Sequence, residues 1–327
     1  MAIYRNQVGE IETAIVNKFN EDVLLGLTSS PKVLQSKYFY DAEGDKLFQM
    51  IMGSPEYYLT DCELEIFSQQ TEKLAQAFLA RYKSFDIIEL GAGDATKSAY
   101  LLKYLTRQKF EFTYFPIDIS HSVITYLRKE LPIKVPGLEI TGLHGEYFDM
   151  INAANKSSDK RKLVLFLGSN IGNFSKQEAV KFLIDFNQCL APGDTILIGF
   201  DLKKNPHQIL AAYNDKAGVT KQFNLNLLKR INSELGGDFD VSQFDHYASY
   251  DPLSGSCKSY LISLKHQNVR ISDKTIHFLK NEPIYMELSQ KYSVKETQEL
   301  AEKAGFKQVD LFYDNHQWFV DAVWEKP

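Results

Sequence analysis

Short apolar runs alternate with amphipathic stretches between residues 85 and 200, and this alternation constrains the fold more than any other feature of the chain. The apolar runs span residues 85–91, 112–118, 138–143, 163–167 and 195–200. Between them, residues 96–107 and 176–190 have the apolar spacing of helices. Strands that alternate with helices of these lengths are typical of an α/β fold with a doubly wound parallel sheet.

The alternation ends after residue 201, which indicates a second domain. A chain of 327 residues also exceeds a single compact core. The second domain is predicted to contain a largely helical stretch and three antiparallel strands, at residues 205–237, 257–265, 269–278 and 284–288. We therefore predict that residues 62–201 with 291–327 form the parallel-sheet domain, and that residues 1–61 with 202–290 form an inserted α+β domain.

Three further elements follow from local patterns. Apolar residues at helical spacing predict helices over residues 10–27 and 61–82. Residues 306–313 and 318–324 flank an Asp-Asn-His-Gln turn and predict a β-hairpin at the end of the chain. The segment 38–60 is rich in aromatic residues without a sustained period, which predicts a loop with short helices, and ordered aromatic loops often line binding sites.

Composition excludes several kinds of partner. The net charge is -5 and the basic residues are scattered, which is unlike a surface that binds nucleic acid. The run 156–162 is interrupted by other residues and is predicted to be a solvated loop. No apolar stretch reaches the ~20 residues that a membrane span requires, and residues 1–12 lack the apolar region of a signal peptide.

Cysteine usage indicates the compartment. The three cysteines, Cys62, Cys189 and Cys257, are far apart and do not have the spacing of metal ligands. We expect them to be free thiols in a reducing compartment. The expectation is therefore a cytoplasmic, monomeric protein without a metal site, which binds neither membrane nor nucleic acid and acts on a small molecule.

The junction after the first apolar run carries the sharpest local motif. It contains Glu89, Gly91, Gly93 and Asp94, and glycines here let the backbone approach a ligand at the carboxyl edge of the sheet. A dinucleotide-binding loop would have a third glycine where this chain has Thr96. The Asp94 carboxylate would also repel a pyrophosphate near the helix N-terminus. A dehydrogenase is therefore disfavoured, whereas a phosphate-free ligand with an ammonium group would suit the carboxylate. The remaining alternative is that the glycines merely form a tight turn.

This acidic-x-Gly-x-Gly motif resembles that of class I methyltransferases, which have a Rossmann-like fold and use S-adenosylmethionine. The resemblance implies cofactor contacts from Glu89, Gly91, Gly93 and Asp94. It also implies contacts from residues after the second and third strands, namely Asp118, Glu146 and Tyr147. Asp118 is placed to accept hydrogen bonds from ribose hydroxyls, although NAD enzymes share this feature. The alternative for Glu146 and Tyr147 is a surface turn.

Four other segments resemble a narrower family, the histidine-specific Nα-methyltransferases that make hercynine, the precursor of ergothioneine. The segments are 38–60 together with Glu63, 166–174 (Phe-Leu-Gly-Ser-Asn-Ile-Gly-Asn-Phe), 212–239 (beginning Ala-Tyr-Asn-Asp) and 287–292 (Glu-Leu-Ser-Gln-Lys-Tyr). The resemblance runs from about residue 10 to the C-terminus. It implies that the parallel-sheet domain binds the cofactor and that the inserted domain binds the substrate.

The resemblance also implies roles for individual residues. Asn173 and Tyr213 match a pair that holds the carboxylate of the amino acid, and the Gly168 carbonyl lies where it can meet the amine. The matches to imidazole-binding residues are Tyr57, Glu287 and Ser289, and Tyr40 matches a tyrosine that lines the same pocket. Residues two apart on a strand share a face, so Glu287 and Ser289 could both contact the imidazole. Tyr40, Gly168 and Asn173 are then the residues nearest the reacting amine.

One departure from the family bears on the substrate. Where family members commonly have Glu-Met-His-Leu, this chain has Lys-Ser-Tyr-Leu at residues 258–261, so Ser259 replaces a methionine. If that methionine packs on the imidazole, Ser259 makes the wall smaller and more polar. The alternatives are therefore a methyltransferase for another amino acid or biogenic amine, or a methyltransferase-like module that binds without catalysis.

Overall fold

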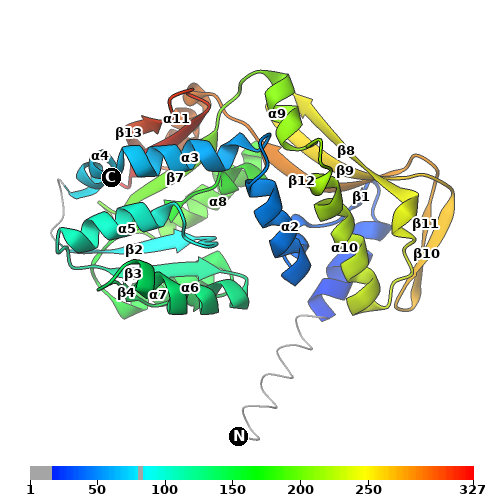
Figure 1. The fold of residues 1–327 in the computed structure, drawn as a ribbon, viewed down its shortest axis with the longest axis horizontal. Coiled ribbons are helices and arrows are strands. Elements are labelled where there is room, and N and C mark those ends of the chain that lie inside the picture. The colour runs from blue at the N-terminus through cyan, green and yellow to red at the C-terminus, as the bar shows by residue number, and fades with distance from the viewer. Residues whose placement is uncertain (1–16, 80–83) are drawn as a thin grey trace, which may run out of the picture. The chain divides into compact units, whose positions relative to one another are not determined.

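The computed structural model describes residues 17–79 and 84–327, and this part of the chain divides into two compact units (Figure 1). The parallel-sheet unit comprises Tyr58–Lys204 and Gln290–Pro327. The insertion unit comprises the described residues up to Tyr57 together with Asn205–Ser289. The chain therefore passes between the units near residues 57, 204 and 289, close to the predicted boundaries after residues 61, 201 and 290.

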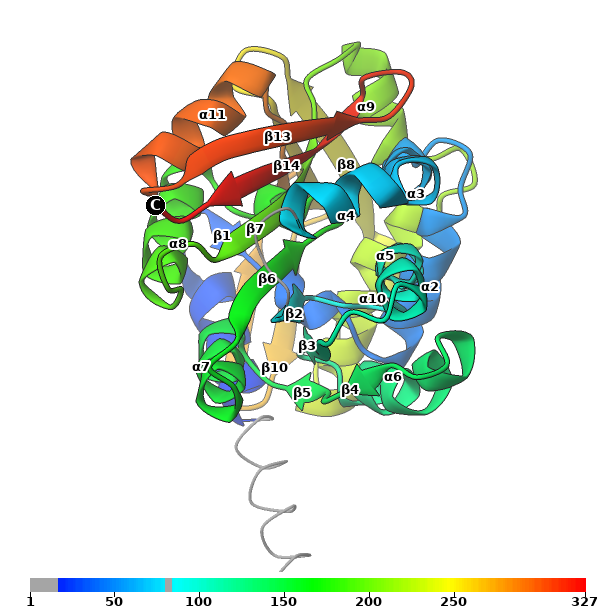
Figure 2. The ribbon, with the colours of Figure 1, turned by 90° about the vertical axis from the view of Figure 1, so that its left-hand side faces the viewer.

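The parallel-sheet unit contains an eight-stranded sheet. Its strands are β2 (Phe85–Leu90), β3 (Thr113–Asp118), β4 (Glu139–Ile140), β5 (Leu143–His144), β6 (Arg161–Phe166), β7 (Thr195–Asp201), β13 (Lys307–Tyr313) and β14 (Phe319–Glu325). Their order is β13-β14-β7-β6-β2-β3-β4, with β5 also pairing with β3, and the sheet can be followed from β13 in Figure 2. Strands β2 to β7 are parallel, and the β13–β14 hairpin is antiparallel to β7. The predicted doubly wound sheet and terminal hairpin are confirmed.

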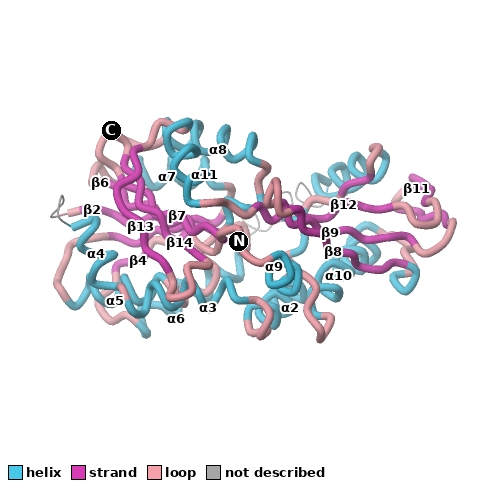
Figure 3. Tube along the Cα trace, turned by 90° about the horizontal axis from the view of Figure 1, so that it is seen from above, coloured by secondary structure: helices cyan, strands magenta, loops and turns pink. Residues whose placement is uncertain are grey.

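Helices cover both faces of this sheet (Figure 3). One face carries α3 (Tyr58–Gln69), α4 (Thr71–Leu79), α5 (Ser98–Arg107) and α6 (His121–Lys134), and the other carries α7 (Tyr147–Ser157), α8 (Lys176–Gln188) and α11 (Val294–Lys303). Every residue of β2 and β7 is buried, as expected for strands between two helical layers.

The prediction of a single helix over residues 61–82 is wrong. Two helices, α3 and α4, are separated at Gln70, and residues 80–82 lie outside the described residues. The Thr71 hydroxyl donates to the Phe67 carbonyl, a side-chain bond of the kind that bends helices. The Gln70 amide donates to the Tyr313 carbonyl at 2.8 Å. Local polar bonds therefore interrupt an apolar pattern that continues across the break.

The prediction of a solvated loop at residues 156–162 is wrong at both ends. Helix α7 runs to Ser157 and β6 begins at Arg161. Lys162 is buried, and its Nζ lies 3.1 Å from Asp86 Oδ2, which is also buried. The same Nζ donates to the carbonyls of Ser158 and Lys160 at 2.8 and 2.6 Å. A buried lysine with this set of partners cannot be distinguished from a surface lysine by its sequence neighbours.

The insertion unit contains a four-stranded sheet and a two-stranded hairpin. The sheet strands are β1 (Lys32–Val33), β8 (Phe244–Asp251), β9 (Ser256–Ser263) and β12 (Pro283–Gln290), in the order β1-β12-β9-β8. The hairpin strands are β10 (Gln267–Ile271) and β11 (Lys274–Phe278). Residues 17–28 are helical, and the other helices are α2 (Ala42–Met52), α9 (Pro206–Ala212) and α10 (Val219–Leu235). Part of the predicted helix over 10–27 therefore lies outside the described residues.

Two predictions for this unit are corrected. The segment 269–278, predicted as one strand, turns at residues 272–273 to form the β10–β11 hairpin. Strand β8 was not predicted, because its sequence Phe-Asp-His-Tyr-Ala-Ser-Tyr-Asp buries only Phe244 and Ala248. A strand with so few apolar residues lacks the alternation that sequence patterns detect. None of the helices in residues 17–79 and 84–327 is both long enough and apolar enough to span a membrane.

Candidate functional site

The loop between β2 and α5 has the backbone conformation that its glycines were predicted to allow. Gly91 has a φ of +65° and Gly93 a φ of +53°, in the left-handed region that favours glycine. A methyl group on Gly93 would meet no heavy atom within 4 Å, whereas one on Gly91 would lie 3.1 Å from both the Tyr147 hydroxyl and the Asn170 amide nitrogen. The loop therefore has free space at Gly93 and polar neighbours at Gly91.

Asp118 links this loop to the end of β3. Its Oδ2 accepts from the Gly93 nitrogen at 3.2 Å, and its Oδ1 accepts from the Ser120 nitrogen at 2.8 Å. Burial raises the pKa of the Asp118 carboxyl, and these two hydrogen bonds act in the opposite direction. A carboxylate has about four acceptor positions, so the group can bind further donors.

Glu89 and Asp94, also predicted to contact the cofactor, have different surroundings. Glu89 is buried and accepts from the Tyr114 hydroxyl. Burial raises the pKa of Glu89 to about 7, although hydrogen bonds from Tyr114 and Ser98 act to lower it. Asp94 lies in the loop itself, where its Oδ1 accepts from the Thr96 nitrogen at 3.0 Å. Glu89 therefore lies in the core under the loop, whereas Asp94 stabilises the turn into α5.

The predicted pair after the third strand lies at the start of α7. The Tyr147 ring makes edge contacts with Phe166 and Phe182, with centroids 5.9 and 6.2 Å apart, and its hydroxyl lies beside Gly91. Burial raises the pKa of Tyr147. Glu146 precedes the helix as its N-cap residue and is exposed. The structure thus brings Tyr147, but not the Glu146 carboxylate, into contact with the loop.

A polar turn follows β6 and contains two of the predicted substrate residues. Gly168 and Ser169 have φ values of +72° and +56°, and the 3-10 helix η2 (Asn170–Asn173) follows. The Ser169 hydroxyl accepts from the Asp201 nitrogen at 3.1 Å, which ties the turn to β7. Asn173 is exposed at the end of η2. The Gly168–Asn173 turn and the glycine loop are neighbours at the carboxyl edge of the sheet, because the Asn170 amide lies beside Gly91.

Two residues of this region were missed by sequence reasoning. Both Glu63 oxygens accept from the Gly168 nitrogen, at 2.8 and 2.9 Å, and Lys97 forms an ion pair with the same carboxylate. Glu63 belongs to a segment that resembles the family, but no role was inferred for it. Lys97 follows the glycine loop, and a lysine at a helix start has no distinguishing pattern of its own.

The insertion unit gathers most of the remaining predicted residues in one cluster, which we call the tyrosine cluster: Tyr40, Phe48, Tyr57, Tyr213 and Ser289. Ring centroids are 5.6 Å apart for Tyr40 and Phe48, 6.4 Å for Phe48 and Tyr57, and 6.2 Å for Tyr57 and Tyr213. The Tyr213 and Ser289 hydroxyl oxygens are 2.7 Å apart. Phe48 was not predicted as a site residue, although its segment was recognised.

Glu287 and Ser259 lie on neighbouring strands of the same unit. Glu287 is half-buried on β12, two residues before Ser289. Ser259 is 2% exposed on β9, the strand next to β12, and alternates there with other buried residues. The serine that departs from the family pattern is therefore a core position of the sheet that carries Glu287.

The sheet order with its antiparallel end hairpin, the glycine loop after β2 and the acid at the end of β3 define a class I, Rossmann-like methyltransferase. The family model described as "Histidine-specific methyltransferase, SAM-dependent" matches residues 19–326, and the chain belongs to this family.

Curated relatives match most of the chain. The histidine N-alpha-methyltransferase of Mycolicibacterium smegmatis is 33% identical, over 90% of this chain and 90% of that protein. The protein of the same name from Mycobacterium tuberculosis is 34% identical, over 83% of each chain. Ergothioneine biosynthesis protein 1 of Neurospora crassa is 32% identical over 85% of this chain but only 32% of its own length.

Proposed function

We propose that this chain transfers methyl groups from S-adenosylmethionine to the α-amino group of L-histidine until the trimethylated product, hercynine, is formed. This reaction would be the first step of ergothioneine biosynthesis. The observation that carries the proposal is the tyrosine cluster, in which four residues matched to histidine binding lie together within a chain of this family. The parallel-sheet unit would bind the cofactor and the insertion unit the imidazole.

The residues around the glycine loop fit the cofactor. S-adenosylmethionine, when bound, supplies a methyl group activated by a sulfonium. The free space at Gly93 allows close approach to the backbone, and the partly free Asp118 carboxylate can accept from ribose hydroxyls. Asp94 supplies an anion for an ammonium. Tyr147 adds an aromatic surface beside Gly91.

The chain's own residues would orient histidine and keep its amine neutral. Glu287, Tyr57 and Ser289 would bind the imidazole, and Tyr213 and Asn173 the carboxylate. Because the Tyr213 and Ser289 hydroxyls share a hydrogen bond, each fixes the orientation of the other.

Alignment of the amine contributes most of the rate in such a displacement. Burial favours the neutral amine, and its proton would leave to water.

The direct test is to incubate the pure protein with S-adenosylmethionine and each proteinogenic amino acid in turn, and to measure products by mass spectrometry. We expect histidine to gain one, two and finally three methyl groups. If another amino acid is methylated at least as efficiently, histidine is not the substrate, although the protein remains a methyltransferase. If no amino acid is methylated while the cofactor binds, a non-catalytic module becomes the better description.

A second candidate function, methylation of another amino acid or a biogenic amine, is favoured by Ser259. The position is buried, so replacing a methionine there changes the volume and polarity of the core beside Glu287's strand. We further propose that the protein acts as a monomer in the cytoplasm. The thiols of Cys62 and Cys189, which form no disulfide, are consistent with a reducing compartment.

Replacing Asp118 with alanine is expected to weaken binding of S-adenosylhomocysteine by about 1–3 kcal/mol, because a hydrogen bond to a charged acceptor is lost. Isothermal titration calorimetry measures this directly. Asp149→Ala, which removes an exposed acid from the first turn of α7, is the control and should bind normally. Unchanged affinity in the Asp118 variant would remove this residue from the cofactor site.

A further inference from the structure

Glu63 on α3 is completely buried and has no part in the roles proposed above. Its two carboxylate oxygens lie 2.8 and 2.9 Å from the Gly168 nitrogen. Gly168 opens the turn that contacts the glycine loop, since a methyl group on Gly91 would lie 3.1 Å from the Asn170 amide nitrogen. The Glu63 carboxylate therefore fixes a peptide group next to the loop proposed to bind the methyl donor.

Lys97 provides the opposite charge for this carboxylate. Its Nζ forms an ion pair with Glu63, and a methyl group on Gly168 would lie 3.6 Å from the same Nζ. Burial acts to lower the pKa of Lys97, but the Glu63 carboxylate outweighs this effect and raises it. Glu63, Lys97 and the Gly168 peptide therefore form one connected group, which joins α3 to the start of α5 and to the turn after β6.

The neighbouring strands leave room for the Glu63 side chain and place a second buried acid beside it. A methyl group on Gly199 of β7 would lie 2.3 Å from Glu63 Oε1, so a side chain at this position would displace the Glu63 carboxylate. Asp321 of β14 pairs with Gly199 across the sheet and is also buried. Burial and the charge of Glu63 raise the pKa of Asp321 well above its ordinary value. Gly199 and Asp321 therefore border the Glu63 side chain from two neighbouring strands.

We propose that Glu63 is a positioning residue for methyl transfer, which holds the Gly168–Asn173 turn in the conformation that presents the substrate amine to the methyl donor. The inference rests on the proposed function, because it concerns the same reaction. Glu63 acts through Gly168 and does not itself touch the substrate. Hydrogen bonds to a charged acceptor are about twice as strong as neutral ones. Misplacement of reacting groups by about 1 Å can cost on the order of a hundredfold in rate.

The test compares Glu63→Gln and Glu63→Asp with the unaltered protein, using kcat, KM for histidine and the Kd of S-adenosylhomocysteine. Glutamine removes the charge at nearly constant size. Aspartate keeps the charge for the flexible Lys97 but withdraws the carboxylate from Gly168. We expect kcat to fall about tenfold or more in both variants, with KM and Kd changing less than about threefold, because alignment and not binding is lost. If the glutamine variant does not fold, the aspartate variant carries the test.

Glu65→Gln is the matched control, because Glu65 lies on the same helix and also accepts from a backbone nitrogen, that of Asn315 at 3.0 Å. Its kcat should stay within about twofold of the unaltered protein.

Three results would overturn the inference: an unchanged kcat in the aspartate variant, a loss of kcat accompanied by an equal loss of cofactor affinity, or an equal loss in the Glu65 control. Failure of the unaltered protein to methylate histidine would instead refute the proposed substrate, and the comparison would then use the amine that is methylated.

Discussion

Asp201→Asn is expected to lower the free energy of unfolding by about 3–5 kcal/mol, the usual cost of removing one partner from a buried ion pair. Asp201 ends β7 and is completely buried. Lys291 Nζ lies 2.6 Å from its Oδ2, Lys204 forms a second ion pair, and the Tyr58 hydroxyl donates at 2.9 Å. Because Lys291 is also completely buried, the asparagine variant would remove a charge that compensates its ammonium.

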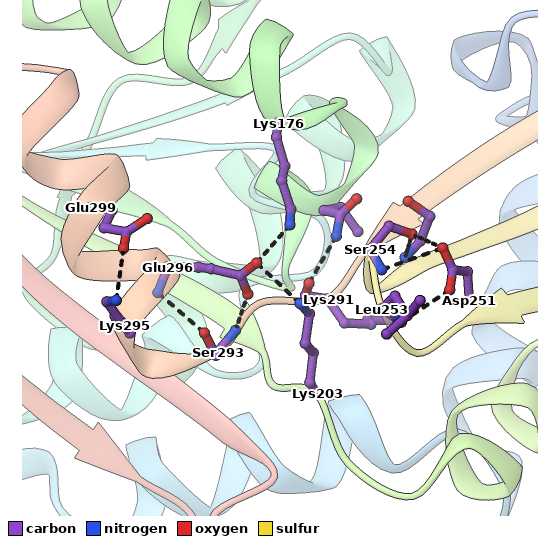
Figure 4. A network of polar contacts seen from close by, with 12 residues as sticks. Lys176, Lys203, Asp251, Leu253, Ser254, Lys291, Ser293, Lys295, Glu296 and Glu299 are labelled. Atoms are coloured by element: carbon purple, nitrogen blue, oxygen red, sulfur yellow. Dashed lines mark hydrogen bonds and ion pairs between the residues drawn. The ribbon is translucent and has the colours of Figure 1, made fainter.

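This effect can be measured by urea denaturation of the Asp201→Asn variant and of a control variant on the surface. The control is Glu299→Gln, which removes the partner of Lys295 in an exposed pair with a distance of 3.6 Å (Figure 4). Exposed pairs of this kind contribute about 0–1 kcal/mol. Equal losses in Asp201→Asn and Glu299→Gln would show that the buried carboxylate contributes no more to stability than a surface one.

The same carboxylate gives a pH dependence of defined sign. Burial acts to raise the pKa of Asp201, but the charges of Lys291 and Lys204 outweigh it, so the pKa is lowered in the folded protein. A group with a lowered folded pKa stabilises the protein above its unfolded pKa of about 3.9, and this contribution is lost as the pH falls further. Below about pH 4, the unaltered protein should therefore lose stability more steeply than the asparagine variant.

Glu287→Ala is expected to lower kcat/KM for histidine roughly ten- to a hundredfold while leaving the Kd of S-adenosylhomocysteine unchanged. A charged hydrogen bond in a closed site contributes about 1.5–3 kcal/mol, and Glu287 is the carboxylate that we assign to the imidazole. Steady-state kinetics and calorimetry separate the two effects. Glu282→Ala, which removes the partner of Lys32 just before β12, is the control and should leave kcat/KM unchanged. An equal loss in both variants would assign the effect to the sheet and not to the imidazole.

The companion variant, Ser259→Met, tests the departure from the family. Restoring the apolar side chain should lower KM for histidine. The gain in binding free energy from the buried apolar area is on the order of 1 kcal/mol. If the methionine variant instead only loses activity with histidine, without any fall in KM, Ser259 belongs to the sheet core alone.

The elements that sequence predicts well are those whose burial is uniform. Strands β2 and β7 are buried at every residue, so their apolar runs are unmistakable. Strand β8 buries only Phe244 and Ala248 and gives no such signal. The burial of Lys162 could not be predicted either, because it depends on Asp86, 76 residues earlier in the chain.

Some of the candidate site residues could also be predicted from the sequence, and others could not. Tyr40, Tyr57, Tyr213 and Ser289 were predicted through a family resemblance, and the structure brings them into one cluster. Physical reasoning from sequence found the glycine loop, since positive φ angles require glycine there. Glu63 was missed because its partner, Gly168, lies 105 residues away. A contact at that separation has no periodicity or spacing by which it can be recognised.

The chain leaves and re-enters the parallel sheet at a single point. Leu202 and Tyr292 form a parallel bridge, the Tyr292 nitrogen donates to the Asp201 carbonyl at 3.1 Å, and the Lys203 nitrogen donates to the Tyr292 carbonyl at 2.8 Å. The outgoing and returning segments are therefore held next to each other by these backbone hydrogen bonds. A different segment with closely spaced termini could be grafted there without changing the strand order of the sheet. Because the insertion unit also includes the described residues up to Tyr57, its exchange would require replacement of that segment together with residues 205–289, while the strands of the parallel sheet stay unchanged.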